Sequence, residues 1–284
     1  MTRAEAESFT QRIRNAAARE GIAPIRMRNR IGFQRLLARL ALDDDWILKG
    51  GFCLEVRLGL RARATKDLDI LRRGSAPTSS LDLQDTLDAA LETDLGDGFT
   101  FRVRLPKPMR LEDAEPSTWR VMVEVQFAGA EYGTVAVDIV TLPGTNNAHA
   151  GDLEPLRIEP AVVGEPFEML ALDVHRHAAE KLHAYARLYA YERPSSRVKD
   201  LVDLVLLDES ALLDDARLGS ALTTVFTERA TDLPTTLPDP PGDWLAPYAA
   251  LAAEAGTNIT ALDAARRIAD ELYERARAKE GNAP

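Results

Sequence analysis

The chain has 284 residues, and 45% of them are hydrophobic, which is enough for a buried core in one large domain or two modest ones. A single cysteine excludes an intrachain disulfide and a cysteine-based zinc cluster. Because no run approaches the roughly 20 apolar residues that span a bilayer, we expect a soluble, cytoplasmic protein with no membrane partner.

The formal net charge of −10 is unevenly distributed along the chain. Residues 21–73 contain 12 Lys and Arg against 6 Asp and Glu, whereas residues 201–284 contain 7 against 15. A local phosphate-binding face is therefore compatible with an acidic protein. The alternative is that the arginines of the second predicted helix only form its solvated side, and these are Arg26, Arg28, Arg30, Arg35 and Arg39.

The first part of the chain mixes helical and strand patterns. Apolar spacing near 3.6 residues predicts helices over residues 5–20, 24–42, 52–58 and 80–95. Short apolar runs and alternation predict strands over residues 46–48, 66–71, 99–105, 119–127, 134–141 and 156–163. This order of elements indicates an α/β domain.

After Gly164-Glu165-Pro166 the apolar spacing becomes helical. Helices are expected over residues 168–190 and 196–207 and over most of residues 245–279, with an ordered loop or linker at the proline-rich stretch 233–244. The sequence therefore predicts two domains, an α/β domain over residues 1–165 and a helical C-terminal domain over residues 166–284.

Two acidic residues, Asp67 and Asp69, lie two positions apart on one predicted strand. Side chains alternate across a strand, so both carboxylates are expected on one face while Leu68 and Ile70 lie on the other. Strands are depleted in Asp, and a solvated edge strand is the simplest explanation of such a pair. The functional explanation is a divalent-cation site, since Mg²⁺ binds a few carboxylate oxygens together with substrate phosphates.

The surroundings of this strand favour the cation site. Upstream, Lys49-Gly50-Gly51 connects a predicted strand to a helix, where glycines let the backbone approach a ligand and the helix N-terminus offers N–H groups to an anion. Downstream, Asp138 supplies a third carboxylate on a strand that is otherwise apolar, where an unpaired charge would be costly. Glu124 competes for this third position if the predicted hairpin is symmetric.

A threonine directly before the predicted strand is a candidate for regulation. Thr65, two residues before Asp67, is a candidate site of regulatory phosphorylation, because a phosphate there would add roughly −1.5 to −2 charges beside two carboxylates. The alternative is that Thr65 only begins the strand.

In the first C-terminal helix, Lys181 shares a face with residues at four-residue spacing, and a solvated polar face is the alternative there.

Several runs resemble a known family. LKGGFCLEVRLGLRARATKDLDI followed by VDIV matches the pattern of DNA polymerase β-type nucleotidyltransferases, in which paired glycines precede Asp-x-Asp and a third carboxylate. AEKLHAYARL, SSRVKDLVDL and FTERATDLPTTLPDPPGDW are similar to the AbiEii/AbiGii toxin family, which includes the MenT toxins of mycobacteria. The resemblance touches both predicted domains. It implies a bi-lobed α+β fold, with a polymerase β-like domain built on a mixed sheet and a helical C-terminal domain after it.

The resemblance also implies a function. By this resemblance we expect transfer of a nucleoside monophosphate from an NTP to an RNA acceptor, and specifically to the 3′ end of tRNA, on which some family members act. This transfer would block translation, as expected of the toxin of a toxin–antitoxin pair. Its partners would be an NTP, RNA and a cognate antitoxin protein, and a monomer is favoured. A nucleotidyltransferase acting on a small molecule such as an antibiotic, or on a protein hydroxyl, is one alternative. A catalytically inactive binding module is another, although retention of all three carboxylates argues against it.

The implied site can be carried onto this sequence residue by residue. Asp67, Asp69 and Asp138 would hold two Mg²⁺ ions, for which Mn²⁺ can substitute. Lys181 would bind the triphosphate, and Asp200 in the run RVKD would orient it. The remaining candidates for nucleotide binding are Lys49, Gly50, Gly51, Lys66 and Arg197.

Overall fold

A computed structural model describes residues 3–109, 118–141, 152–187 and 197–280 of the chain. The chain forms two compact units. The first comprises Met1–Cys53 and Thr65–Ala171, and the second comprises Leu54–Ala64 and Leu172–Pro284. The sequence places the boundary after residue 165, whereas the compact units divide between Ala171 and Leu172 and a short earlier segment belongs to the second unit.

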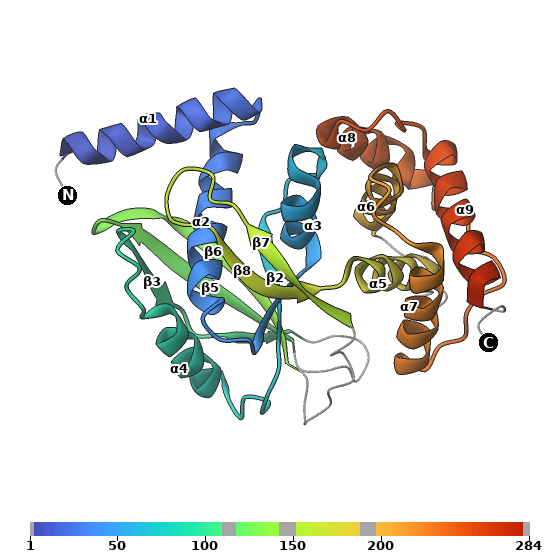
Figure 1. The fold of residues 1–284 in the computed structure, drawn as a ribbon, viewed down its shortest axis with the longest axis horizontal. Coiled ribbons are helices and arrows are strands. Elements are labelled where there is room, and N and C mark those ends of the chain that lie inside the picture. The colour runs from blue at the N-terminus through green and yellow to red at the C-terminus, as the bar shows by residue number, and fades with distance from the viewer. Residues whose placement is uncertain (1–2, 110–117, 142–151, 188–196, 281–284) are drawn as a thin grey trace. The chain divides into compact units, whose positions relative to one another are not determined.

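The first unit is a mixed sheet with helices (Figure 1). Its strands are β1 (Trp46–Lys49), β2 (Asp67–Arg72), β3 (Phe99–Val103), β4 (Lys107–Met109), β5 (Thr118–Phe127), β6 (Ala130–Thr141), β7 (Leu153–Ile158) and β8 (Phe167–Leu172). Its helices are α1 (Arg3–Glu20), α2 (Pro24–Leu40), the start of α3 (Gly50–Leu58) and α4 (Ser80–Leu91). The strand order is β3-β5-β6-β2-β1-β8-β7, and β4 pairs with β5.

The centre of this sheet combines parallel and antiparallel pairs. Strand β2 lies between β1, which is antiparallel to it, and β6, which is parallel to it. Helices α2 and α4 contact β6 and β3 respectively, and they contact each other. The side chains of the buried sheet face are Leu68, Ile70, Val121, Val123, Val125, Val135, Val137 and Ile139. Because side chains alternate, the intervening residues of β2, β5 and β6 lie on the opposite face.

The arginines of α2 have a structural role that the sequence did not indicate. Arg35 and Arg39 are almost fully buried, and both contact Asp97, with Arg39 Nη2 2.9 Å from Asp97 Oδ1. Burial raises the pKa of Asp97, but hydrogen bonds from Arg39 and from the Phe99 N–H outweigh it and hold the pKa below its usual range. Neither interpretation of these two arginines, a phosphate-binding face or a solvated helix side, is correct.

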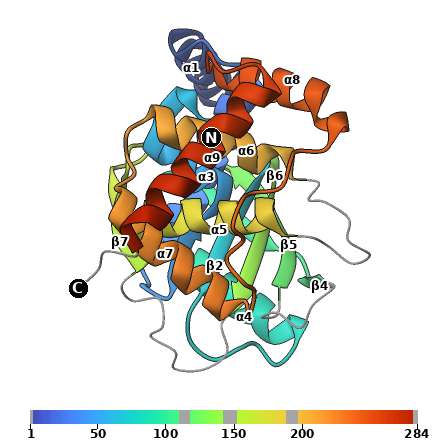
Figure 2. The same ribbon diagram turned by 90° about the vertical axis from the view of Figure 1, so that its right-hand side faces the viewer.

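The second unit is helical (Figure 2). Its elements are the rest of α3, η1 (Gly59–Arg61), α5 (Val174–Ala186), α6 (Val198–Glu209), α7 (Asp215–Glu228), η4 (Gly242–Trp244), α8 (Leu245–Ala255) and α9 (Leu262–Glu280). Helices α6 and α7 both contact α9, and α5 contacts α6 and α7. Leu54 belongs to the same hydrophobic core as Leu201, Leu272 and Tyr273, and Leu58 packs against it. This packing explains why the segment after Cys53 belongs to the helical unit.

The largest local error of the sequence analysis lies at the start of the helical part. A helix was expected from residue 168, but residues 167–172 form strand β8, which pairs in parallel with β1 through Ala171 and Leu48. A short apolar run does not distinguish a buried strand from a helix. Helix α5 begins only at Val174, where the Asp173 carboxylate accepts hydrogen bonds from the His175 and Arg176 N–H groups as an N-cap. Helix α7 and strand β4 were not anticipated.

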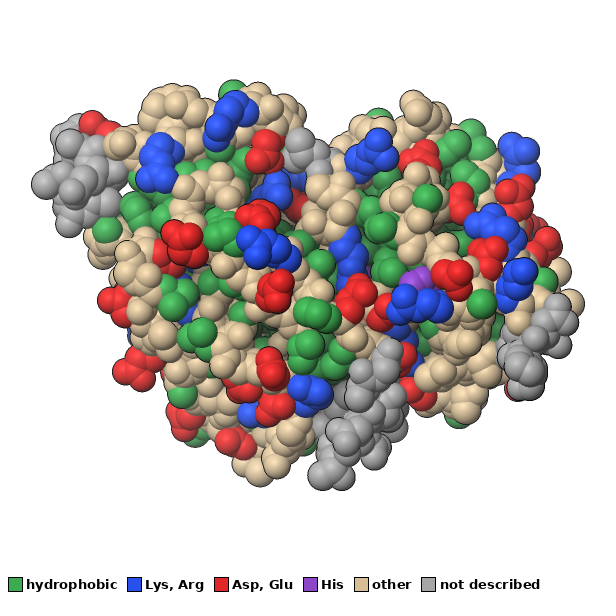
Figure 3. All heavy atoms as spheres, viewed as in Figure 1, with side chains coloured by type: hydrophobic (Ala, Val, Ile, Leu, Met, Phe, Trp, Pro, Cys, Tyr) green, Lys and Arg blue, Asp and Glu red, His purple; other side chains and the backbone are tan. Residues whose placement is uncertain are grey.

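The expected architecture, an α+β mixed sheet followed by a helical C-terminal part, is confirmed. Among the described helices, none has the length and hydropathy required to span a bilayer. On the sheet-and-helix unit, Figure 3 shows acidic and basic side chains interspersed over the visible face, so the net negative charge does not give this face a single sign.

Candidate functional site

Asp67 and Asp69 occupy the polar face of β2, as expected. Both side chains are half-buried, whereas Leu68 and Ile70 between and beside them are fully buried. The alternation of the strand therefore directs both carboxylates away from the apolar core of the first unit. A solvated edge strand, the alternative explanation of this pair, is excluded because β2 lies between β1 and β6 in the sheet.

The third carboxylate, Asp138, lies directly opposite Asp69 on the neighbouring strand β6. On the other side of β2, Lys49 is the register partner of Asp69, and Arg120 of β5 is the register partner of Asp138. Four charged residues thus form one row across four adjacent strands, in the order Arg120, Asp138, Asp69 and Lys49. This row brings together residues that are up to 89 positions apart in the chain, between Lys49 and Asp138.

Glu124 does not occupy the third position. Its register partner on β6 is Thr134, and its carboxylate contacts Arg104, with Oε1 2.7 Å from Nε. Four residues of strand separate Glu124 from Arg120, which corresponds to about 13 Å. The hairpin register therefore places Asp138, and not Glu124, in the row with Asp69.

Arg120 is a residue of this site that sequence reasoning missed. Its guanidinium makes two hydrogen bonds to the Asp138 carboxylate, of 2.7 Å from Nε and 2.6 Å from Nη2. It also lies 3.7 Å from Asp67 Oδ2. The hydrogen bond and the charge of Asp138 raise the pKa of Arg120, and the charges of Asp67 and Asp69 add to this effect. The only sequence signal was a basic residue on the polar side of a strand that pairs with the Asp138 strand.

Gly50 brings the backbone of the chain against Asp69. Gly50 has a φ of +68°, and a Cβ atom at this position would overlap the Asp69 carboxylate. Helix α3 begins at this glycine, and the buried Gly51 follows it. The glycine therefore allows a close approach of the backbone to a carboxylate of the site, while the expected approach to a ligand stays a prediction.

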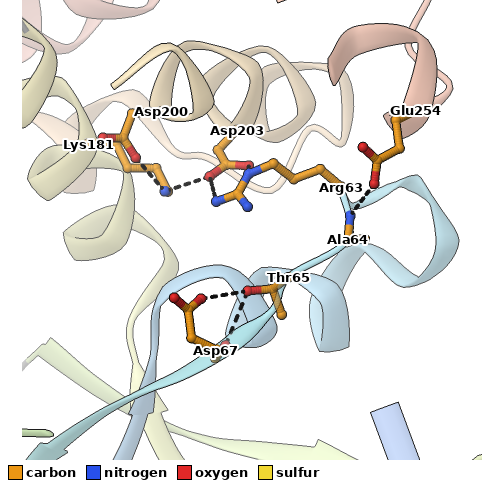
Figure 4. A network of polar contacts seen from close by, with 8 residues as sticks. All are labelled: Arg63, Ala64, Thr65, Asp67, Lys181, Asp200, Asp203 and Glu254. Carbon is orange, nitrogen blue, oxygen red and sulfur yellow. Dashed lines mark hydrogen bonds and ion pairs between the residues drawn. The ribbon is translucent and has the colours of Figure 1, made fainter. Parts of the chain in front are cut away.

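Thr65 lies directly before β2, and its hydroxyl is close to Asp67 (Figure 4). Its Oγ1 is 3.2 Å from the Asp67 carbonyl oxygen and 3.3 Å from Asp67 Oδ1, and the residue is only 7% exposed. Lys66, which follows it, is exposed. The proximity of Thr65 to a site carboxylate agrees with the expectation, while the burial of the residue was not foreseen.

Lys181 lies in the second unit, in a cluster of four charged side chains, of which Lys181, Asp200 and Asp203 are buried and Arg63 is partly buried (Figure 4). Its Nζ is 3.0 Å from Asp200 Oδ1 and 2.7 Å from Asp203 Oδ2. Arg63 donates two 3.0 Å hydrogen bonds to Asp203, one to Oδ1 and one to Oδ2, so it shares Oδ2 with Lys181. Burial lowers the pKa of Lys181, but Asp203 and Asp200 outweigh it and leave the pKa above its ordinary value. The lysine is therefore protonated and held by two anions.

The face of α5 that carries Lys181 is buried, so its interpretation as a solvated polar face is wrong. Asp200 is close to Lys181, as the resemblance implied, and Arg197 is more exposed, with Nη1 3.7 Å from Asp200 Oδ2. Asp203 and Arg63 were missed as members of this cluster. An available signal was the position of Asp203 within the otherwise apolar run LVDLVLL, where a buried charge requires a partner.

The carboxylates of the sheet can be tested as ligands of a divalent cation. Asp67 and Asp69 are hard oxygen donors on one face of β2, a set that suits Mg²⁺ when substrate phosphates complete the coordination. Asp138 is adjacent, but both of its carboxylate oxygens accept hydrogen bonds from Arg120. Accordingly, within the described ranges no group of three acidic, histidine or cysteine side chains is already arranged around an ion position. Asp67 and Asp69 therefore have the donor chemistry of divalent-cation ligands, whereas Asp138 is occupied by Arg120 in this arrangement.

The chain is similar to a described protein family and to a solved structure. The family described as "Nucleotidyl transferase AbiEii toxin, Type IV TA system" matches residues 33–277. Among solved structures, the chain is similar to MenT4, a nucleotidyltransferase toxin from Mycobacterium tuberculosis H37Rv, with a TM-score of 0.52 and 20% identity over 94% of this chain and 88% of that chain. At this identity the likeness concerns the fold. No curated protein matches.

Proposed function

Because the chain belongs to the AbiEii family of nucleotidyl transferase toxins of type IV toxin–antitoxin systems, we propose that it transfers a nucleoside monophosphate from an NTP to an RNA hydroxyl, and specifically to the 3′ end of tRNA. A tRNA with a blocked 3′ end cannot be aminoacylated, so this transfer would stop translation. The family assigns the chain an NTP substrate and an antitoxin partner. The RNA acceptor, the divalent metal and the block of translation go beyond the family assignment and belong to our proposal.

The reaction forms one bond and breaks one. The acceptor hydroxyl oxygen bonds to the α-phosphorus of the NTP, the bond from that phosphorus to the bridging oxygen breaks, and pyrophosphate leaves. Two Mg²⁺ ions, or Mn²⁺ in their place, would stabilise the attacking and leaving oxygens. Asp67 and Asp69 would hold these ions with the triphosphate. Asp138 would be a further ligand of the ion that activates the acceptor hydroxyl, and it would accept the proton of that hydroxyl.

The observation that supports this assignment most strongly is the row of charges across the sheet. Asp138 is the register partner of Asp69, and Asp67 lies on the same face of β2. The three carboxylates lie within one small area of a sheet face, where Arg120 pairs with Asp138, and a divalent cation bound there would add to the compensation of their charge. Gly50 lets the backbone approach Asp69 closely, which places the start of α3 beside a proposed metal ligand, and helix N-termini bind phosphate through their N–H groups.

Further side chains are proposed to bind the nucleotide. Lys181 would contribute its charge to the triphosphate, with Asp200 and Asp203 determining the position of its ammonium. The proposal also includes, as weaker contacts to phosphate, the side chains of Lys49, Lys66 and Arg197 and the backbone of Gly50 and Gly51.

The test is label transfer from each of four α-³²P-labelled NTPs to total tRNA in the presence of Mg²⁺. The wild-type protein is compared with Asp69→Asn, which keeps the shape and removes the charge, and with Asp85→Asn, which removes a charge from the exposed side of α4. We expect transfer by the wild type and by Asp85→Asn only. Periodate-oxidised tRNA, which has no intact 3′ diol, should accept no label.

Three other outcomes of this experiment would change or remove the proposed function. Transfer to oxidised tRNA would move the acceptor hydroxyl away from the 3′ end. Label in a small molecule or in protein, with none in tRNA, would replace the RNA acceptor by one of those classes. Full activity of Asp69→Asn would remove the role of the carboxylates altogether.

A further inference from the structure

Arg120 holds the carboxylate that the proposed reaction requires as a metal ligand. Its guanidinium donates to both oxygens of Asp138, at 2.7 Å and 2.6 Å, and it also lies 3.7 Å from Asp67 Oδ2. Such two-point contacts between ions are stronger and more directional than ordinary hydrogen bonds. A cation of the protein thus occupies the same carboxylate oxygens that a bound metal would use.

The arrangement differs from a structural ion pair in the core. The Arg120 side chain is 46% exposed and that of Asp138 is 16% exposed, and Arg120 extends from β5 towards Asp67 of β2, whereas Arg39 and Asp97 in the same unit are almost completely buried. A pair whose cation stays in contact with water loses less on separation than a buried pair. Arg120 can therefore leave Asp138 at small cost once another cation compensates that carboxylate.

We propose that Arg120 is an internal counter-cation of the metal site, which competes with the metal for Asp138 and, once displaced, binds a phosphate of the incoming nucleotide. This inference rests on the proposed nucleotidyltransferase function. The nucleotide is the anion that arrives together with the metal, and the planar fork of a guanidinium matches phosphate oxygens. Arg120 would then exchange one anionic partner for another during substrate binding.

Two consequences distinguish this role from simple support of the sheet. The metal alone binds weakly, because it has to displace Arg120 before any phosphate is present. The nucleotide strengthens metal binding, because it provides the displaced guanidinium with a new partner. Since coupling between two ligands is reciprocal, the metal strengthens nucleotide binding by the same factor.

The test measures Mn²⁺ binding by electron paramagnetic resonance, with and without an NTP analogue whose α–β bridging oxygen is replaced by methylene. Arg120→Gln removes the charge and keeps polarity. Arg104→Gln is the matched control. Arg104 is 60% exposed and forms a similar ion pair with Glu124, which lies on β5 together with Arg120. Asp69→Asn reports whether the ion binds at the carboxylates. Thermal unfolding checks that each variant is folded.

We expect Arg120→Gln to bind Mn²⁺ alone about tenfold more tightly than the wild type, the effect of removing one competing charge-assisted contact at a half-exposed site. The analogue should strengthen Mn²⁺ binding less in Arg120→Gln than in the wild type, and Arg104→Gln should behave as the wild type. Arg120→Lys, which keeps the charge without the fork, should give an intermediate Mn²⁺ affinity.

The proposal is overturned if Arg120→Gln binds Mn²⁺ no more tightly than the wild type, or if the analogue strengthens binding equally in both. If Asp69→Asn abolishes the Mn²⁺ binding of the wild type, the ion binds at the carboxylates. Either of these results for Arg120→Gln then refutes only the counter-cation role of Arg120 and leaves the proposed function intact. Absence of Mn²⁺ binding in every protein, together with absence of transfer, refutes both.

Discussion

Lys181 and Asp203 form a buried ion pair between α5 and α6, with Nζ 2.7 Å from Oδ2. Asp203 also accepts two hydrogen bonds from Arg63, and Asp200 contacts Lys181 from one turn earlier on α6. Two cations and two anions therefore balance in a region of the helical unit that is largely closed to water. Removing one member leaves a buried charge without compensation, which costs more than the pair itself contributes.

The first prediction separates the structural from the functional role of this lysine. Lys181→Met should lower the free energy of unfolding by about 3 kcal/mol, because two carboxylates lose their shared partner. Lys181→Met/Asp200→Asn removes one of these charges and should recover part of the loss. Urea unfolding measures both, and transfer should stay absent in both variants. Recovery of transfer together with stability would show that Lys181 acts only through folding.

The second prediction concerns the contact between Gly50 and Asp69. Gly50→Ala should lower the free energy of unfolding by about 1–3 kcal/mol, because the backbone has positive φ, and it should also abolish transfer by displacing the Asp69 carboxylate. Gly21→Ala is the control, since Gly21 has a similar φ of +66° and no atom within 4 Å of the added Cβ. It should cost about 1 kcal/mol and leave transfer unchanged. Equal transfer by both variants would contradict the proposed importance of this contact.

The third prediction is a pH dependence at the N-cap of α5. Burial raises the pKa of Asp173, but hydrogen bonds from His175 and from the Arg176 N–H outweigh it and lower the pKa to about 2. The folded-state pKa is below the unfolded-state value, so the stabilisation is present above the unfolded-state pKa and is lost as the pH falls toward 2. At pH 7 it amounts to about 2 kcal/mol.

Asp173→Ala should therefore be less stable than the wild type by at least this amount at pH 7, and the difference should fall by about 1 kcal/mol between pH 7 and pH 3. Urea unfolding at several pH values measures it. Asp239→Ala is the control for removal of a carboxylate, because the Asp239 side chain is 98% exposed. A pH-independent difference for Asp173→Ala would mean that the carboxylate charge does not stabilise the helix.

What the sequence predicted depended on local periodicity. The common face of Asp67 and Asp69 follows from the two-residue period of a strand, and the glycine turn follows from Gly50-Gly51, so both could be found without a structure. The position of Asp138 opposite Asp69 requires parallel pairing between β2 and β6, which the sequence does not encode locally. The sequence favoured Asp138 over Glu124 because an unpaired charge on an otherwise apolar strand would be costly. The structure favours Asp138 because the pairing register places it, and not Glu124, opposite Asp69.

The partners of the arginines were the least predictable from the sequence. The sequence pattern places both Arg35 and Arg120 on the polar side of an amphipathic element. In the structure Arg35 is buried beside Asp97, whereas Arg120 contacts Asp138. The difference depends on carboxylates that lie 62 positions away from Arg35 and 18 positions away from Arg120. An arginine can cover apolar surface with its stem and reach a distant acid with its head group, so its partner depends on tertiary structure.

The last prediction uses the position of Thr65. Its hydroxyl lies 3.3 Å from Asp67 Oδ1 in a residue that is 7% exposed, so a negative charge added here would face a proposed metal ligand at short range. Two like charges about 4 Å apart repel by roughly 4 kcal/mol at an effective dielectric constant of 20. The added charge would also attract the cations and lysines that the triphosphate requires. Modification of Thr65 by a phosphate, with roughly −1.5 to −2 charges, should therefore silence the enzyme.

Thr65→Glu and Thr65→Gln form a matched pair that isolates charge from size. Both introduce a longer side chain, and the loss of the hydroxyl is common to both, so any difference between them reports the carboxylate. We expect Thr65→Glu to transfer label at least about a hundredfold more slowly than Thr65→Gln, since each 1.4 kcal/mol corresponds to a factor of ten. Comparable rates would show that a charge at this position does not reach the site. A phosphate on Thr65 carries more charge than Glu, so protein phosphorylated at Thr65 should regain transfer after phosphatase treatment, and full activity of the phosphorylated form would reject this means of regulation.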